Sequence, residues 1–166
     1  MAIQGSEWTP GAIVPHLTVR NLDESIDFYR VAFGAIELYR SPATAEFGQL
    51  ASLKIWNSVI LVSAELPSQR PEKPELGFVA SPETLRGTTC VFQICVPDAD
   101  DVYHRAVRSG ALPAMPLTDM FWGDRYGWVR DPFGYLWAIC SVNEIVSPEE
   151  NDRRMFLAAE RKVETR

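Results

Sequence analysis

The stretch HLTVRNLDESIDFYRVAFGA, residues 16–35, decides the fold because it joins a strand to a complete helix. The apolar, β-branched run 12–20 that leads into it is typical of a strand. Asn21 or Asp23 can cap the helix that follows, and apolar residues then recur with helical spacing up to Gly34, a suitable end. The stretch therefore predicts a strand followed directly by a helix over 21–35.

The same order recurs in the second half of the chain. VPDADDVYHRAVRSGA, residues 96–111, repeats the acidic helix start and the Gly-Ala end about 77 residues further on, as a duplicated unit does. A strand-like run over 88–96 precedes this second helix. Three more such runs follow each helix, namely 35–40, 48–56 and 58–66, then 112–117, 125–130 and 135–142. The sequence thus predicts an α+β protein built from tandem βαβββ units.

The domain organisation follows from this repeat. At 166 residues the chain suits one domain, 1–166, with halves over about 12–66 and 88–142. Residues 67–87 hold four Pro and two Gly and are predicted to be a linker or loop. A C-terminal helix is predicted over 147–163, since Ser147 and Glu150 form a capping box around Pro148.

Composition excludes several classes of partner. The net charge of −6 and pI near 4.9 argue against nucleic-acid binding, and no apolar run approaches the length of a membrane span. The first residues lack the basic and apolar regions of a signal peptide. Three Cys without a CxxC pair do not form a disulfide framework. We expect a cytoplasmic protein with reduced thiols and neither nucleic-acid nor membrane partners.

The run DMFWGDRYGWVRDPFGYLWAIC, residues 119–140, followed by SPEE at 147–150, is the most specific signal in the chain. With the duplicated unit, it resembles the vicinal oxygen chelate superfamily, which includes glyoxalases, bleomycin-binding proteins, fosfomycin-resistance enzymes and ring-cleaving dioxygenases. The resemblance implies that the two units curl their strands into a mixed β-sheet cup with flanking helices and a ligand inside. It also implies a homodimer.

In metal-dependent members of this superfamily, four inward-facing positions carry His or Glu ligands. By motif, these positions correspond here to Val14, Leu61, Val91 and Ala138, none of which can bind a metal. We therefore expect a subgroup that uses no metal and no other cofactor. His16 lies two residues beyond the first position, so strand alternation points it into the cup, although a backbone group can equally satisfy a partly buried His. His104 is expected to face solvent from its helix.

The expected interior of the cup is apolar with isolated hydrogen-bonding groups, which is typical of a small-molecule pocket. The aromatic and charged run 119–128 would form its rim, and DPFG (131–134) is predicted to make a tight turn before the last cup strand. Asp119, Asp124 and Arg125 are expected to form an ion-pair cluster. The candidate catalytic residues are His16, Asp119 and Tyr126. The candidate substrate-binding residues are Gln93, Trp56, Phe121, Trp122, Arg125, Trp128 and Cys95.

Two functions are compatible with these residues. The favoured one is a metal-independent enzyme acting on a small carbonyl-bearing or aromatic molecule as a lyase, isomerase or cyclase, with protons moving through the three catalytic candidates. The alternative is a protein that sequesters a drug or metabolite stoichiometrically, as bleomycin-binding relatives do. A cup kept only for assembly is a third possibility.

Overall fold

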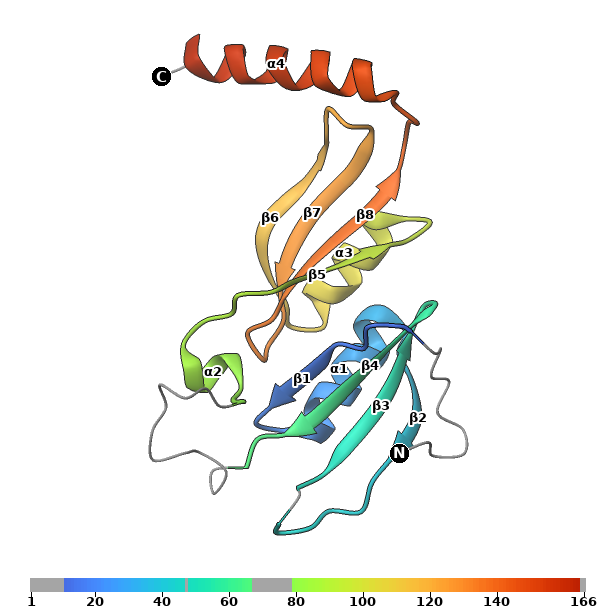
Figure 1. Ribbon diagram of the computed structural model, residues 1–166, viewed down its shortest axis with the longest axis vertical. Helices are drawn as coiled ribbons and strands as arrows, with labels where there is room; N and C mark the ends of the chain where they lie inside the picture. Colours follow the sequence, from blue (N-terminus) through green and yellow to red (C-terminus); the bar gives the residue numbers. More distant parts are fainter. Residues whose placement is uncertain (1–10, 47, 67–78, 165–166) are drawn as a thin grey trace.

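The α+β fold expected from the sequence is confirmed in the computed structural model, which describes residues 11–46, 48–66 and 79–164 (Figure 1). The first unit contains β1 (His16–Val19), α1 (Leu22–Phe33), β2 (Ile36–Arg40), β3 (Leu50–Ile55) and β4 (Ser58–Ala64). The second contains β5 (Val91–Cys95), α3 (Ala99–Arg108), β6 (Leu112–Asp119), β7 (Asp124–Arg130) and β8 (Leu136–Val142). A short helix, α2 (Pro82–Leu85), lies between the units, and α4 (Pro148–Glu164) follows the second.

The two units repeat one sheet topology. The strand orders are β1-β4-β3-β2 and β5-β8-β7-β6, and in each sheet the first strand runs parallel to the last. His16 pairs with Leu61 in the first sheet, and Gln93 pairs with Ala138 in the second. Gln93 follows His16 along the chain by the same number of residues as Ala138 follows Leu61. The duplication inferred from the helices therefore extends to the register of the strands.

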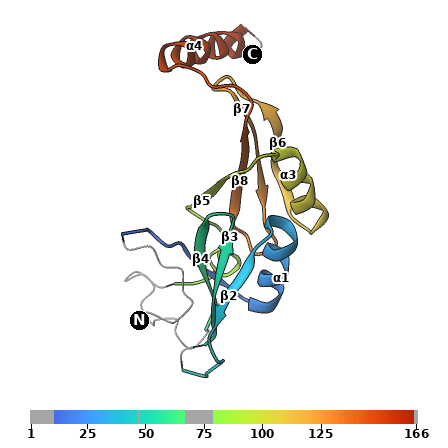
Figure 2. The same cartoon turned by 90° about the vertical axis from the view of Figure 1, so that its right-hand side faces the viewer.

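The two sheets lie end to end along the molecule, and α4 projects beyond the far end of the second sheet (Figures 1 and 2). Part of the predicted linker, 67–78, falls outside the described residues. In the remainder, Ser81 caps α2 by accepting a hydrogen bond from the Thr84 N–H, a helix that the sequence analysis did not predict. Within the described ranges, no helix is long and apolar enough to cross a membrane.

The capping residues of the helices act as their types predict. Asn21, rather than Asp23, caps α1, with its Oδ1 accepting from the Glu24 N–H at 3.2 Å. Gly34 ends the helix with φ 71°, a conformation that costs glycine little. Asp98 caps α3 in the same way as Asn21 caps α1. These caps fix the residue at which each helix begins after its strand.

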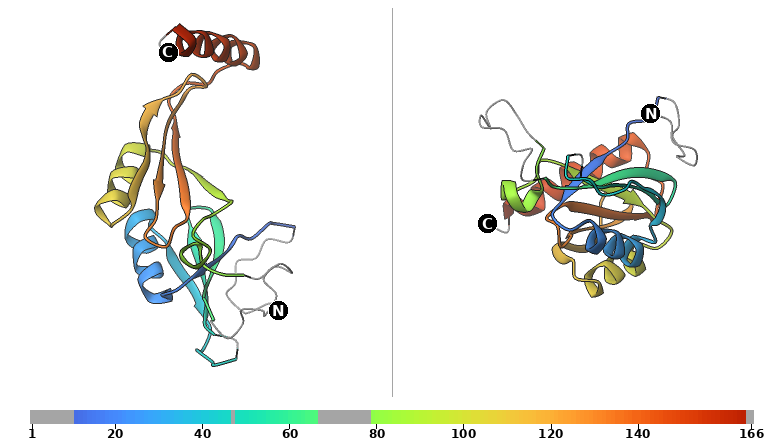
Figure 3. Two further views of the ribbon diagram at one scale, coloured as in Figure 1. Left: turned by 90° about the vertical axis from the view of Figure 1, so that its left-hand side faces the viewer. Right: turned by 90° about the horizontal axis from the view of Figure 1, so that it is seen from below.

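One core joins the two units. Helices α1 and α3 lie beside one another on the same side of the molecule, and the Arg105 side chain donates to the Ala32 carbonyl at 2.9 Å (Figure 3). Rings from both units meet beneath them, with Phe33 and Trp137 at 4.7 Å between centroids. At the edge of the first sheet, the Tyr135 hydroxyl accepts from Thr18 N–H at 2.8 Å and donates to the Thr18 carbonyl at 3.0 Å. The second unit thus satisfies a free strand edge of the first.

Candidate functional site

The second sheet has one face packed on the helices and one face without a covering helix, which we call the open face. Phe92, Ile94 and Ile139 belong to the core or pack against it. Residues that alternate with them project to the opposite side, and the register sets them in rows across the strands. The open face carries Gln93 and Cys95 of β5, Ala138 and Cys140 of β8, and Asp124, Tyr126 and Trp128 of β7.

Aromatic rings form a continuous row along the end of this face. The centroids of Phe121 and Trp122 are 4.9 Å apart, those of Trp122 and Tyr126 are 5.5 Å apart, and those of Tyr126 and Trp128 are 6.5 Å apart. Every contact is edge-to-face, the geometry that aromatic quadrupoles favour. The Trp122 Nε1–H donates to the Asp124 carboxylate at 3.0 Å, which fixes the second ring of the row.

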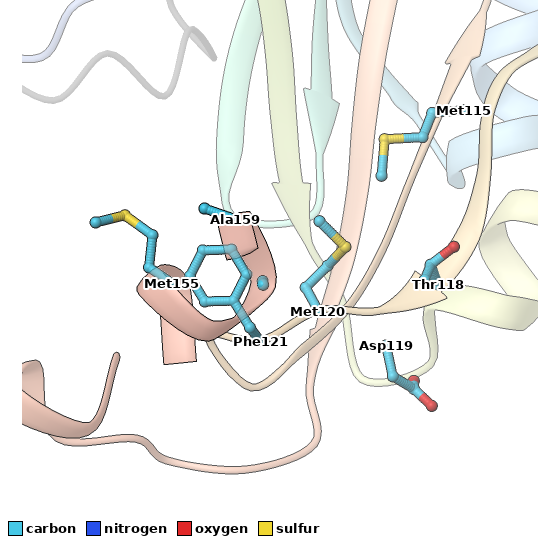
Figure 4. A pocket seen from close by; sticks show the side chains of 8 residues that line it. Met115, Thr118, Asp119, Met120, Phe121, Met155 and Ala159 are labelled. Carbon is cyan, nitrogen blue, oxygen red and sulfur yellow. The ribbon is translucent and has the colours of Figure 1, made fainter. Parts of the chain in front are cut away.

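A cavity of about 720 Å³ adjoins this aromatic row beneath α4 (Figure 4). In the close-up, the Phe121 ring lies next to Met155 and Ala159, whereas the Asp119 carboxylate points away from the apolar side chains. Met115 and Thr118 pair in register with Trp128 and Tyr126, so the cavity and the open face share a wall. Its lining residues are Met115, Thr118, Asp119, Met120, Phe121, Met155, Ala158 and Ala159.

Helix α4 is held over this cavity by Arg154. Its guanidinium donates to both carboxylate oxygens of Glu144 at 2.7 and 2.8 Å, and also to Glu150. The hydrogen bonds from Arg154 hold the pKa of the Glu144 carboxyl below its usual value. The turn before β7 is equally constrained, because Gly123 has φ +99° and a Cβ there would lie 2.2 Å from the Glu144 carbonyl oxygen.

Arg125 lies on the helix side of β7 and not on the open face. Its Nε and Nη2 donate to the two oxygens of Asp100 on α3, both at 2.9 Å, and its Nη1 lies 3.4 Å from Asp119. These hydrogen bonds lower the pKa of Asp100. The cluster expected from the sequence thus differs in membership: Asp100 joins Asp119 and Arg125, while Asp124 points to Trp122. The geometry assigns Arg125 to the contact between α3 and the second sheet.

His16 lies on the first sheet, apart from the other catalytic candidates. It is exposed, its Nε2 is 3.0 Å from the Ser63 hydroxyl, and partial burial lowers its pKa. It lines a cavity of about 580 Å³ between the units, together with Cys90, Phe92 and Tyr135. Asp119 and Tyr126 belong to the second sheet, so the structure does not bring the three candidates together within one chain.

Trp56 is also remote from the open face of the second sheet. It occupies the turn between β3 and β4 with φ 54°. Its side chain lines a separate cavity of about 500 Å³ with Lys54 and Arg105. Of the substrate-binding candidates, Gln93, Cys95 and Trp128 lie on the open face, while Phe121 and Trp122 border it.

Asp124 belongs to this face although it was not among the predicted site residues. The signal was present, because Asp124, Tyr126 and Trp128 alternate along one strand and therefore point the same way. The sequence did not reveal the partner of Asp124. The close spacing of the charges had indicated Arg125, whereas the structure shows Trp122. The carboxylate contributes to a raised pKa of the Cys140 thiol, after the larger effects of burial and of Cys95.

The residues at the positions of the expected metal ligands do not fit a metal ion. The register shows that His16 and Gln93, rather than Val14 and Val91, are the partners of Leu61 and Ala138. Two of these four side chains are apolar, and only His16 is a ligand of the usual kind. Within the described part of the chain, no group of three or more His, Cys, Asp or Glu side chains is arranged to hold a metal ion.

Comparison with known proteins identifies the family. A family model described as the Glyoxalase/Bleomycin resistance protein/Dioxygenase superfamily matches residues 11–139. The chain belongs to this superfamily. The resemblance noted in the sequence and the vicinal oxygen chelate fold that it implied are thereby confirmed.

Relatives in the superfamily include an uncharacterized protein of Mycobacterium bovis, 37% identical over 130 residues that cover 77% of this chain and 81% of the relative. TioX from Micromonospora sp. ML1 is 27% identical, with a TM-score of 0.58 over 80% of this chain and 98% of TioX. The fosfomycin resistance protein FosX of Listeria monocytogenes, crystallised with Mn(II) and sulfate, is 16% identical with a TM-score of 0.57. The match covers 89% of this chain and 99% of the FosX chain, and it shows a likeness of fold alone.

Proposed function

We propose that this superfamily member binds a small, flat organic molecule on the open face of the second sheet, beneath α4. The observation that carries the proposal is the row of four aromatic rings beside an apolar cavity of about 720 Å³. Ligand pockets typically measure roughly 300 to 1,000 Å³ and are lined by apolar and aromatic side chains with a few polar groups. An aromatic ligand would extend the edge-to-face row that the protein already contains.

The polar groups on the open face restrict the chemistry of the ligand. Gln93 offers an amide, Asp124 a carboxylate, and Tyr126 a hydroxyl, all on the same side of the sheet as Trp128. A carboxylate beside aromatic rings favours a ligand that carries a cationic or hydrogen-bond-donating group. The net charge of −6 acts in the same direction, because it favours the approach of cations.

We propose further that the active form is a cytoplasmic homodimer. The two sheets of one chain lie end to end, so neither covers the open face of the other (Figure 1). A cup requires two half-cups facing one another, and a second copy can supply the missing half to each. His16 on the first sheet of one protomer would then approach the open face of its partner's second sheet.

The binding proposal is tested with 9-aminoacridine, a flat aromatic cation, titrated against the intrinsic Trp fluorescence. We expect stoichiometric quenching by the wild type and at least about tenfold weaker binding by Trp128→Ala, because losing one aromatic contact and its buried area removes roughly 1.4 kcal/mol. Trp56→Ala is the matched control, since Trp56 lines a different cavity. Equal binding by Trp128→Ala and the wild type would refute the proposed site.

Acid–base catalysis on the bound molecule is the second candidate function, and the state of His16 favours it. The His16 Nε2 lies 3.0 Å from the Ser63 hydroxyl, and partial burial lowers the pKa of His16, which favours the neutral imidazole that can accept a proton. The test is to recover the compound that co-purifies from the native host and to incubate it with fresh protein. Conversion that is lost in His16→Ala supports catalysis, whereas recovery of the unchanged compound supports binding alone.

A further inference from the structure

Two thiols meet on the open face of the second sheet. Cys95 ends β5, Cys140 lies on β8, and the two residues pair in register across these parallel strands. Residues paired in this way project from the same side of a sheet. Their sulfur atoms are 3.1 Å apart, which makes Cys95 and Cys140 a closely spaced dithiol.

The geometry of the pair suits a disulfide. Neighbouring strands lie roughly 4.7–4.9 Å apart, within the ~4.4–6.8 Å between Cα atoms that disulfides span. A disulfide bond of about 2.05 Å requires the two sulfurs to approach by roughly a further 1 Å, which small side-chain rotations provide. The strands therefore need not separate or change register.

The two thiols lie in different environments, so they differ in their access to a reagent in thiol–disulfide exchange. Cys95 is exposed and can meet a soluble reagent, whereas Cys140 is buried. Burial first, and then the neighbouring Cys95, raise the pKa of Cys140 to about 12. The Gln93 side-chain amide lies 3.6 Å from the Cys140 sulfur and 3.9 Å from the Cys95 sulfur, so it contacts both. Cys90, which is also exposed, lines the separate cavity that holds His16.

We propose that Cys95 and Cys140 are a redox-active pair that forms a reversible disulfide by exchange with a low-molecular-weight disulfide such as glutathione disulfide. The Cys95 thiolate attacks one sulfur of the reagent, breaking its S–S bond and releasing one thiolate. Cys140 then attacks the Cys95 sulfur, displaces the second thiolate and gives up its proton to the medium. The protein dithiol is oxidised, one reagent disulfide is reduced, and two reagent thiols leave with the two protein protons.

Oxidation would alter the wall of the proposed pocket. A disulfide removes two S–H groups beside Gln93 and ties β5, an edge strand, to β8. This consequence for ligand binding rests on the proposed function. The disulfide itself does not, because thiols can be counted without any ligand.

The experiment treats the full-length protein with glutathione disulfide, alkylates the remaining thiols and measures intact mass and tryptic peptides. We expect Cys95 and Cys140 of the wild type to lose their thiols without retaining glutathione on either residue and to recover them with dithiothreitol. Trypsin should yield a linked pair of peptides, 87–105 and 131–153. Peptide 87–105 contains both Cys90 and Cys95, so Cys90→Ser is the matched variant and should form the same linkage.

The other variants separate the two steps. Cys140→Ala should retain one glutathione on Cys95, because the residue that resolves the mixed disulfide is absent, and Cys95→Ala should leave Cys140 unmodified. The circular dichroism spectrum of each variant checks that it is folded. Persistent glutathione on wild-type Cys95, a linkage through Cys90, or disulfides between chains would each overturn the proposal. If the linkage forms but 9-aminoacridine binds the reduced and oxidised proteins equally, only the coupling to the pocket is refuted.

Discussion

Asp131 is the buried charge on which the junction between the two units depends. It is 3% exposed, and its Oδ1 accepts from the N–H groups of Phe133 and Tyr135 at 3.0 and 2.8 Å. Its Oδ2 accepts from the Tyr29 hydroxyl at 2.8 Å and the Trp137 Nε1–H at 2.9 Å. Burial raises the pKa of Asp131 in spite of these four donors, and burial first, then the nearby carboxylate, raise the pKa of Tyr29. One side chain thus fixes a turn and links it to α1.

Asp131→Ala should lower the free energy of unfolding by about 3 kcal/mol or more, because it leaves two side-chain donors buried without an acceptor, at roughly 1–3 kcal/mol each. Urea denaturation followed by Trp fluorescence measures the change. Asp27→Ala is the control: its ion pair with Arg30 is exposed, so a change within about 0.5 kcal/mol is expected. Similar losses in the two variants would show that the buried carboxylate has no special role.

The sequence predicted the elements well because their signals are local. Caps at Asn21 and Asp98, glycine at the end of α1 and the alternation of apolar residues all act within a few neighbours. The errors concern long-range partners. The partner of Arg125 is Asp100, which lies 25 residues away on α3, and no nearby spacing distinguishes it from Asp124. Trp56 is remote from the aromatic row because the folding of the first unit, and not its own residue type, decides its position.

Arg154 supplies hydrogen bonds that tie α4 to the second unit beside the cavity. Arg154 reaches Glu144 and the Phe121 carbonyl outside the helix, whereas Arg153 donates to Glu150 within it. Arg154→Ala should therefore speed hydrogen exchange across residues 148–160, and Arg153→Ala should leave it close to that of the wild type. If both variants exchange alike, Arg154 does not anchor the helix.

The same contacts make the anchoring of α4 sensitive to acid. Hydrogen bonds from Arg153 and Arg154 lower the pKa of Glu150 to about 2, below its ordinary value of 4.5. A carboxyl whose pKa is lowered in the folded state stabilises it above the ordinary pKa, and this contribution is lost as the pH falls through the folded value. Exchange in α4 should therefore quicken between pH 4.5 and about 2, earlier than in α1. A simultaneous change in both helices would indicate global unfolding instead.

The molecule is a duplicated unit whose halves share one core yet leave the second sheet with an open face. Helices α1 and α3 and the residues around Trp137 hold the units end to end. The sequence contained the repeat but not the relative placement of the halves, because that depends on contacts between residues about 100 positions apart, such as Tyr29 with Asp131 and Thr18 with Tyr135. We therefore propose that a second chain completes the cup expected from the family.

The homodimer that we propose would need a contact surface, and α4 offers one. The helix projects beyond the second sheet, and Phe156 and Leu157 on it are 64% and 41% exposed (Figure 2). Burying a side chain of this size stabilises an interface by roughly 1.5–3 kcal/mol.

Light scattering coupled to gel filtration should give twice the chain mass of 18.7 kDa. Phe156→Asp should shift the protein toward the single-chain mass, and Arg153→Asp, which adds the same group about one turn earlier, should not. A wild-type protein of single-chain mass would refute the dimer, whereas a Phe156→Asp protein that stays dimeric would exclude α4 from its interface.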